Sequence, residues 1–236
     1  MACTERMFFG VPIAREQPGQ LADNWAGYRN SPGVLIFARS YLLWRLARSK
    51  MVRTFLTASR DAVVPLGGPA RHQVLIATGC PASTFVPLQS VVRILARAEE
   101  DGAAIFIVDR TVEGVRNLEE NTRATFPGLP VVGRARISPS ISESVTTAIR
   151  KADPRIVLVG ADNRFVLRWV ANNLTGMGNP VVIIAPDAVA HMVGNPRRGV
   201  VRDILDIPAG ILTLPVLLGH RLRAAHRNRK QKTHSS

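Results

Sequence analysis

The feature that most restricts the fold is a regular alternation of short apolar runs with helical segments, which begins near Ala103 and continues to about Ala190. Runs rich in β-branched residues, such as AAIFIVD, LPVVGRAR and RIVLVG, alternate with segments such as VEGVRNLEENTRATF, ISESVTTAIRKAD and FVLRWVANNL. This alternation predicts βαβ units and a parallel sheet. The runs are continuously apolar, which indicates that helices cover both faces of the sheet. We therefore expect an α/β fold with a Rossmann-like parallel sheet.

The first half of the chain is less regular but compatible with the same fold. GVLIFARS, DAVVPLGGP and HQVLIAT (72–78) are interpreted as strands, and YLLWRLARSKMVRTFLTA (41–58) as one helix. PLQSVVRILARAEEDG is predicted to be a helix because Pro stands at its start and Gly at its end. The alternation stops near Val200. The expected parts are an N-terminal extension (1–30), the α/β domain (31–200, more regular from about 103) and a basic C-terminal appendage (201–236).

The formal net charge of +14 is unevenly distributed along the chain. Between Asn24 and Ala98 there are ten Lys or Arg residues and one acidic residue, Asp61, whereas acidic residues return between Glu99 and Asn121. Such asymmetry indicates an anionic partner, which could be nucleic acid, a membrane surface or a phosphorylated substrate. Only 6% of the residues are aromatic and no nucleic-acid-binding motif is present, which makes nucleic acid the weaker alternative.

The C-terminal appendage joins an apolar segment to a basic end. DILDIPAGILTLPVLLG precedes HRLRAAHRNRKQKTHSS, whose basic residues are Arg221, Arg223, Arg227, Arg229, Lys230 and Lys232. A short apolar segment that continues into Lys and Arg is typical of interfacial anchors for anionic lipid. We expect a disordered tail whose basic residues contact the membrane or another anion; a docked C-terminal helix with a frayed end is the alternative.

Several classes of site have no support in the sequence. No apolar run reaches the length of a membrane-spanning helix, and the first residues lack the pattern of a signal peptide. Cys3 and Cys80 form neither a metal-ligand spacing nor a disulfide framework. Asp187 and His191 have helical spacing, but two ligands rarely make a metal site. No Gly-rich phosphate loop occurs, and we expect no metal, no cofactor and a cytoplasmic location.

The order of segments in the second half resembles the WecG/TagA/CpsF glycosyltransferase family. The resemblance is carried by AAIFIVDRTVEGVRNLEENTRATFPGLPVVG (103–133), by ESVTTAIRKADPRIVLVG (143–160), and by Trp169, which falls where the family's signature loop carries a Trp. We expect it to extend over residues 34–200. It implies transfer of an N-acetylmannosamine-type sugar from a UDP donor to a lipid-linked N-acetylglucosamine diphosphate at the cytoplasmic membrane face.

The positions that the family uses for chemistry hold other residues in this chain. The Gln and Glu of the Pro-Lys-Gln-Glu motif ahead of Trp169 are replaced by aliphatic residues, which cannot hydrogen-bond to a sugar. The Asp of the Pro-Asp-Gly turn is replaced by a leucine, which cannot accept a proton. Asp109 and Arg110 stand where the family has a Gly-Gly pair, and Pro81 stands where it has the Asp of a Gly-x-Asp segment. The degenerate positions are Leu66, Pro81, Asp109, Arg110, Val166 and Leu167.

Two carboxylates remain as candidates for an active but divergent transferase. Asp109 ends a predicted strand, and Asp162 lies in the loop after RIVLVG, where ligands bind in open parallel sheets. Asp162 or Asn163 could instead cap the next helix, which is the interpretation we favour for Asp162.

The expected function follows from the resemblance and from what is missing in it. We expect a degenerate, non-catalytic glycosyltransferase-like protein that acts as a scaffold or interaction protein at the inner membrane face. Its partners would be an anionic membrane surface and a protein partner or larger assembly. An active divergent transferase that binds a UDP-sugar is the first alternative, and a nucleic-acid-associated basic protein is the second.

Overall fold

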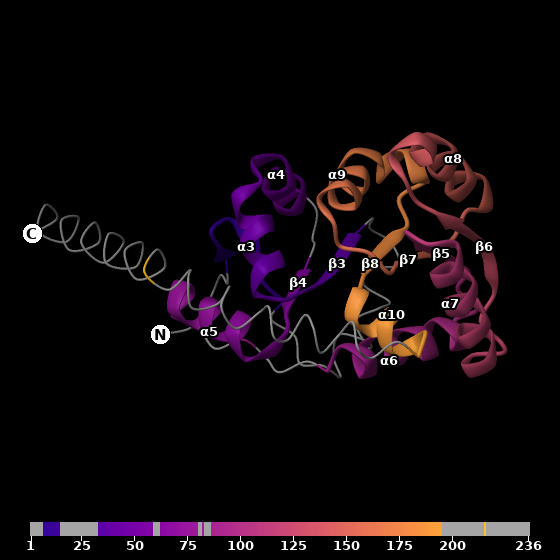
Figure 1. Cartoon of the computed structure of the whole chain (residues 1–236), viewed down its shortest axis with the longest axis horizontal. Helices are drawn as coiled ribbons and strands as arrows, with labels where there is room; N and C mark the ends of the chain where they lie inside the picture. Colours follow the sequence, from indigo (N-terminus) through magenta and orange to yellow (C-terminus); the bar gives the residue numbers. More distant parts are fainter. Residues whose placement is uncertain are drawn as a thin grey trace, which may run out of the picture.

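A parallel sheet forms the centre of the protein in the computed structural model, which describes residues 7–14, 33–58, 62–79, 82, 86–194 and 215. The sheet has six strands in the order β4-β3-β8-β7-β5-β6, and all neighbouring strands are parallel (Figure 1). The strands are β3 (Gly33–Ala38), β4 (Ala62–Pro65), β5 (Ile105–Asp109), β6 (Val131–Arg136), β7 (Ile156–Val159) and β8 (Val181–Ile184). The expected α/β, Rossmann-like fold is therefore confirmed.

Helices cover both faces of this sheet (Figure 1). The helices on one face are α3 (Ser40–Arg48), α4 (Lys50–Ala58), α8 (Ser142–Ala152) and α9 (Arg164–Asn173). Those on the other face are α6 (Pro87–Glu100), α7 (Val112–Thr125) and α10 (Pro186–Met192). In β7, Val157 and Val159 join the core under the first group, while Ile156 and Leu158 join the core under the second. Because both faces are buried, the inner strands are apolar at every position except Asp109, the last residue of β5.

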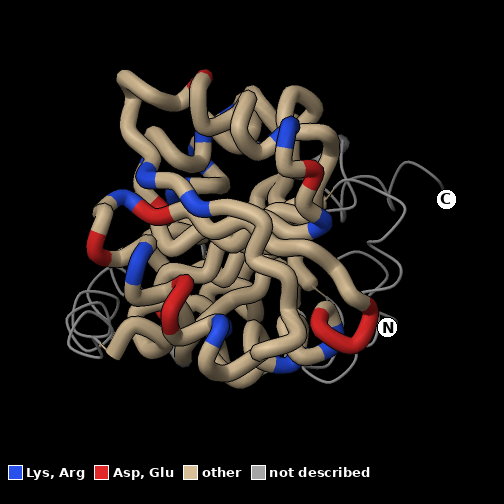
Figure 2. Tube along the Cα trace, turned by 90° about the vertical axis from the view of Figure 1, so that its right-hand side faces the viewer, with Lys and Arg blue, Asp and Glu red and all other residues tan. Residues whose placement is uncertain are grey.

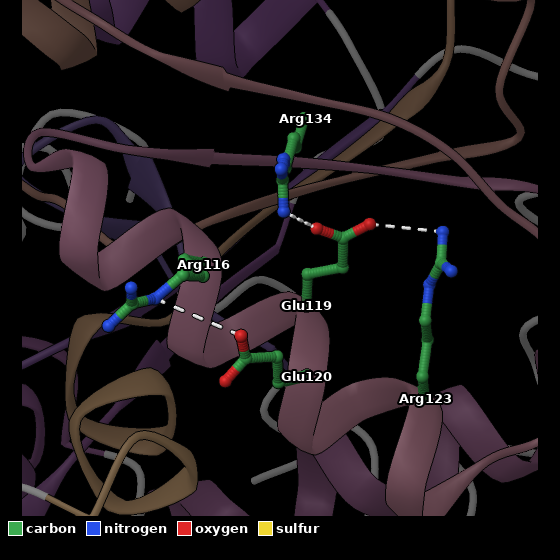
Figure 3. Close-up of polar contacts among 5 residues, drawn as sticks. All are labelled: Arg116, Glu119, Glu120, Arg123 and Arg134. Atoms are coloured by element: carbon green, nitrogen blue, oxygen red, sulfur yellow. Dashed lines mark hydrogen bonds and ion pairs between the residues drawn. The ribbon is translucent and has the colours of Figure 1, made fainter.

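The edge strand β6 differs, because every second residue is exposed. Basic and acidic positions are interspersed on the side of the molecule formed by β6, α7 and α8 (Figure 2). Glu119 of α7 makes ion pairs with Arg134 of β6 and, at 3.0 Å, with Arg123, while Glu120 lies 3.8 Å from Arg116 (Figure 3). Charged side chains on an edge strand discourage pairing with a second sheet.

The segment HQVLIAT (72–78), which we expected to be a strand, is instead the second half of the helix α5 (Gly67–Thr78). Ala70 and Val74, four residues apart, are buried, whereas Leu75 is exposed, as a helix with one buried side requires. Gly79 ends the helix in a left-handed conformation, and its N–H donates to the carbonyl of Leu75. A short apolar run does not distinguish strand from helix, and the glycine was the signal that favoured a helix.

The single helix expected over 41–58 is two helices, α3 and α4, with Ser49 between them. Ser49 has an extended backbone, its Oγ accepts from the N–H of Val52 at 3.4 Å, and its carbonyl accepts from Arg53. Serine before the first turn of a helix is a common start signal. The continuous apolar periodicity of the sequence concealed this break.

A short hairpin, β1 (Met7–Phe8) and β2 (Val11–Pro12), packs against α3 and β4. The Phe9 ring meets that of Trp44 edge to face at 5.6 Å, and the N–H of Ala14 donates to the carbonyl of Val63. Residues 7–14 therefore belong to the core, although we assigned them to an extension. The domain boundaries at residues 30 and 200 stay predictions, and the tail that we expected to be disordered lies outside the described residues. In the part of the chain that the structure describes, no helix is long and apolar enough to cross a membrane.

Candidate functional site

The carboxyl ends of β5 and β7 are the natural place for a site in this sheet. The two strands are neighbours, but α7 follows β5 on one face and α9 follows β7 on the opposite face (Figure 1). The loops that leave the two strands therefore diverge, and in open parallel sheets ligands bind outside such a point. Asp109 and Arg110 follow β5, and Gly160, Asp162 and Asn163 follow β7.

Asp109 is the last residue of β5, and its side chain is buried at the first turn of α7. Its Oδ1 accepts a hydrogen bond from the backbone N–H of Arg110 at 2.6 Å. A Cβ placed on Gly114 would lie 2.1 Å from Oδ2, and one on Gly160 would lie 3.2 Å from Cγ. A side chain at position 114 would collide with the carboxylate, whereas the atom nearest to a Cβ at position 160 is Cγ1 of Val189, at 2.8 Å. The place at a helix N-terminus that would attract a phosphate therefore holds a carboxylate of the chain itself, while Arg110 is exposed.

Asp162 and Asn163 have separate roles at the start of α9. Asn163 is the N-cap, and its side chain accepts from the N–H of Val166 at 2.8 Å. Asp162 is almost buried, and its carboxylate accepts a hydrogen bond from the hydroxyl of Tyr41 in α3. The Arg45 guanidinium lies 3.5 Å from the carbonyl of Asp162. The cap is thus the asparagine, and Asp162 connects the loop after β7 to α3.

The aliphatic residues at the degenerate positions are parts of the core. Leu66 is 2% exposed at the start of α5, and Val166 and Leu167 are 0% and 5% exposed on α9. All three side chains pack in the core, and Leu167 also lines the cavity described below. Pro81 and the basic residues expected to contact an anion lie outside the described residues; the latter are Arg221, Arg223, Arg227, Arg229, Lys230 and Lys232.

A buried ion pair joins the ends of β3 and β8. Nε of Arg39 lies 2.6 Å from Oδ2 of Asp187, and the two side chains are 11% and 3% exposed. His191, the other member of the spaced pair considered from the sequence, is exposed. Among the described residues, no group of three His, Cys, Asp or Glu side chains could hold a metal ion. Sequence reasoning missed the partner of Asp187 because it lies 148 residues earlier.

A cavity of about 650 Å³ lies between α3, α4 and α9, and we call it the arginine cleft. Four arginines line it: Arg45, Arg48, Arg164 and Arg168. Its other lining residues are Tyr41, Trp44, Leu46, Ser49, Val52 and Leu167. The guanidinium of Arg45 lies over the ring of Tyr41, 5.7 Å from its centroid. Sequence reasoning did not single out these arginines, although their spacing places each pair on one helix face.

A six-stranded parallel sheet with helices on both faces defines a Rossmann-like α/β protein. The model of the glycosyl transferase WecG/TagA/CpsF family matches residues 6–199, and the chain belongs to this family. No curated protein matches the chain. The resemblance carried by residues 103–133 and 143–160 is thereby confirmed.

Proposed function

We propose that the chain is a non-catalytic member of its family that works as a binding or scaffold component at an anionic membrane surface on the cytoplasmic side. The observation that carries this proposal is the burial of Leu66, Val166 and Leu167 at positions where the family has polar residues. An aliphatic side chain can neither accept a proton nor hold a sugar hydroxyl. Burial in the core also means that no small rearrangement restores that chemistry.

The two carboxylates that could replace the missing base support the same proposal. The Asp109 carboxylate is packed against Gly114 and Gly160, and the Asp162 carboxylate accepts a hydrogen bond from the Tyr41 hydroxyl. A general base must reach the proton that it removes, within about 3 Å of heavy-atom distance. Both carboxylates already have structural partners of their own.

An active divergent transferase is the second candidate, and one observation favours it. Asp162 lies beside the arginine cleft, since Tyr41 and Arg45 both contact it and both line that cavity. Arginines could neutralise the diphosphate of a UDP-sugar while Asp162 accepts the proton of an acceptor hydroxyl.

Release of UDP distinguishes the two candidates. We expect the purified chain, mixed with UDP-N-acetylmannosamine and a lipid-linked N-acetylglucosamine diphosphate, to release no more UDP than the protein-free blank. Turnover that disappears in Asp162→Asn would show an active transferase and end the non-catalytic proposal. Asp153→Asn, which changes an exposed carboxylate at the end of α8, is the matched control and should behave as the parent.

Sedimentation with phosphatidylglycerol vesicles tests the membrane part of the proposal. We expect the parent chain to sediment with the vesicles at low salt and to be released as the salt concentration rises, because the attraction is electrostatic. A full-length variant with Gln at Arg221, Arg223, Arg227, Arg229, Lys230 and Lys232 should sediment much less. Equal sedimentation of the two proteins would refute a membrane contact by the tail.

A further inference from the structure

The tip of the β1–β2 hairpin has an unusual backbone conformation. Phe8 pairs with Val11, so Phe9 and Gly10 form a two-residue turn, and their φ angles are 49° and 82°. A turn with positive φ at both central residues favours the pair Asn-Gly. Glycine accepts this conformation readily, whereas a bulky residue such as phenylalanine rarely adopts it. The backbone of Phe9 is therefore strained, and contacts outside the turn must hold it in place.

The contacts that hold Phe9 lead to the wall of the arginine cleft. The Phe9 ring meets the Trp44 ring edge to face, with centroids 5.6 Å apart, and Trp44 lines the cleft. Phe8 makes a second edge contact with the same indole, at 6.4 Å. Nη1 of Arg53 in α4 donates to the carbonyl of Phe9 at 3.3 Å. The turn is thereby attached to α3 and α4, two of the three helices that line the cleft.

The two residues that follow the hairpin are anchored to the sheet. Ile13 forms a parallel bridge with Val63 of β4, and the N–H of Ala14 donates to the Val63 carbonyl at 2.9 Å. Since β4 is at one edge of the sheet, Ile13 and Ala14 cover part of that edge. Ala14 packs in the core on one face of the sheet, whereas Trp44 packs against the core on the other face. The anchor and the aromatic contact are thus separate places on one short segment.

Covering the edge of β4 explains Ile13 and Ala14, but it does not require an aromatic residue in the turn. Asparagine at position 9 would give the Asn-Gly pair that this turn favours and would leave the edge contact in place. Trp44 supplies the reason for the phenylalanine, because edge-to-face pairs of aromatic rings are favourable. The turn therefore has a strained backbone and, in return, keeps an aromatic ring against the indole of the cleft wall.

We propose that residues 7–14 act as a strap that holds the wall of the arginine cleft, and that release of the strap from β4 frees Trp44 and changes the shape of the cleft. On release, Phe9 returns to a relaxed backbone and Trp44 loses the two rings that support it. The strain in the bound strap lowers the free energy needed to release it, as expected for a segment that opens locally. The inference goes beyond the proposed function, because it holds whether or not the chain is catalytic.

Fluorine NMR of the full chain labelled with 5-fluorotryptophan tests the aromatic contact. The chain has three tryptophans, and the variants Trp44→Phe and Trp169→Phe identify the resonances of these two. We expect Phe9→Asn to move the Trp44 resonance toward its position in the urea-unfolded chain, while the Trp169 resonance stays in place. Phe9→Tyr keeps an aromatic ring and is the matched control, so it should leave both resonances unchanged. An unmoved Trp44 resonance in Phe9→Asn overturns the proposal.

A second variant tests whether the anchor on β4 is coupled to the cleft wall. Ala14→Pro removes the N–H that donates to Val63 and leaves Phe9 and Trp44 themselves unaltered. We expect it to move the Trp44 resonance in the same direction as Phe9→Asn does, whereas Ala14→Gly keeps the N–H and should match the parent. A segment that only covers the sheet edge would leave Trp44 unmoved in Ala14→Pro, and that result refutes the strap.

Hydrogen exchange of the parent chain decides the question if a variant moves the Trp169 resonance as well and is therefore unfolded. After correction for intrinsic rates, we expect the amides of residues 7–14 to exchange at least about tenfold faster than those of β8, because release of the strap is a smaller opening than global unfolding. Exchange of both segments at one common rate would mean that residues 7–14 open only when the whole domain unfolds, and the proposal would then be wrong.

Discussion

Replacing Asp187 with asparagine is expected to lower the free energy of unfolding by about 3–5 kcal/mol. The carboxylate of Asp187 lies 2.6 Å from Nε of Arg39, and both side chains are largely buried between the ends of β3 and β8. The substitution removes the carboxylate charge that faces this guanidinium in a site from which water is mostly excluded. Urea denaturation followed by circular dichroism measures the change.

The loss of stability in Asp187→Asn should come mainly from the buried Arg39 guanidinium that has lost this carboxylate, and less from the lost contact itself. A double variant, Arg39→Met/Asp187→Leu, replaces the pair with apolar side chains and should recover to within about 1 kcal/mol of the parent. Asp153→Asn, an exposed carboxylate at the end of α8, should change stability by less than about 0.5 kcal/mol. If Asp187→Asn is as stable as this control, the buried pair does not contribute to the native state.

The second half of the fold could be predicted because each local pattern there agrees with its tertiary environment. The run that becomes β5 (Ile105–Asp109) is apolar at nearly every position because helices cover both of its sides. Thr111 caps α7, and its side chain accepts from the N–H of Gly114, so that boundary is also encoded locally. Errors occurred where a pattern was ambiguous, as in HQVLIAT, whose β-branched residues also fit a helix with one buried side.

The candidate site was less predictable because its contacts join distant parts of the chain. The capping role of Asn163 could be foreseen, because its hydrogen bond to the N–H of Val166 joins residues only three positions apart. The hydrogen bond from Tyr41 to Asp162 spans 121 residues, and no local pattern indicates it. The spacing of Arg164 and Arg168 was visible, but their meeting with Arg45 depends on the packing of α3 beside α9.

Replacing Trp169 with alanine should lower the free energy of unfolding by about 3–5 kcal/mol, the usual range for truncation of a buried tryptophan. Its side chain is buried on α9, and the indole N–H donates to Oγ1 of Thr146 in α8 at 3.0 Å. The Thr146 hydroxyl in turn donates to the carbonyl of Ser142 at 2.9 Å. Trp169 therefore joins α9 to α8 through both packing and a hydrogen bond. Chemical denaturation measures the loss.

Two milder variants separate packing from hydrogen bonding. Trp169→Phe keeps much of the volume, and Thr146→Val removes the hydroxyl that accepts from Trp169 and donates to the Ser142 carbonyl, so each should cost about 1–3 kcal/mol. An unchanged free energy of unfolding in Thr146→Val would contradict a structural role for this hydrogen bond. The packing and the hydrogen bond of Trp169 need no substrate, so its place on α9 has a structural explanation.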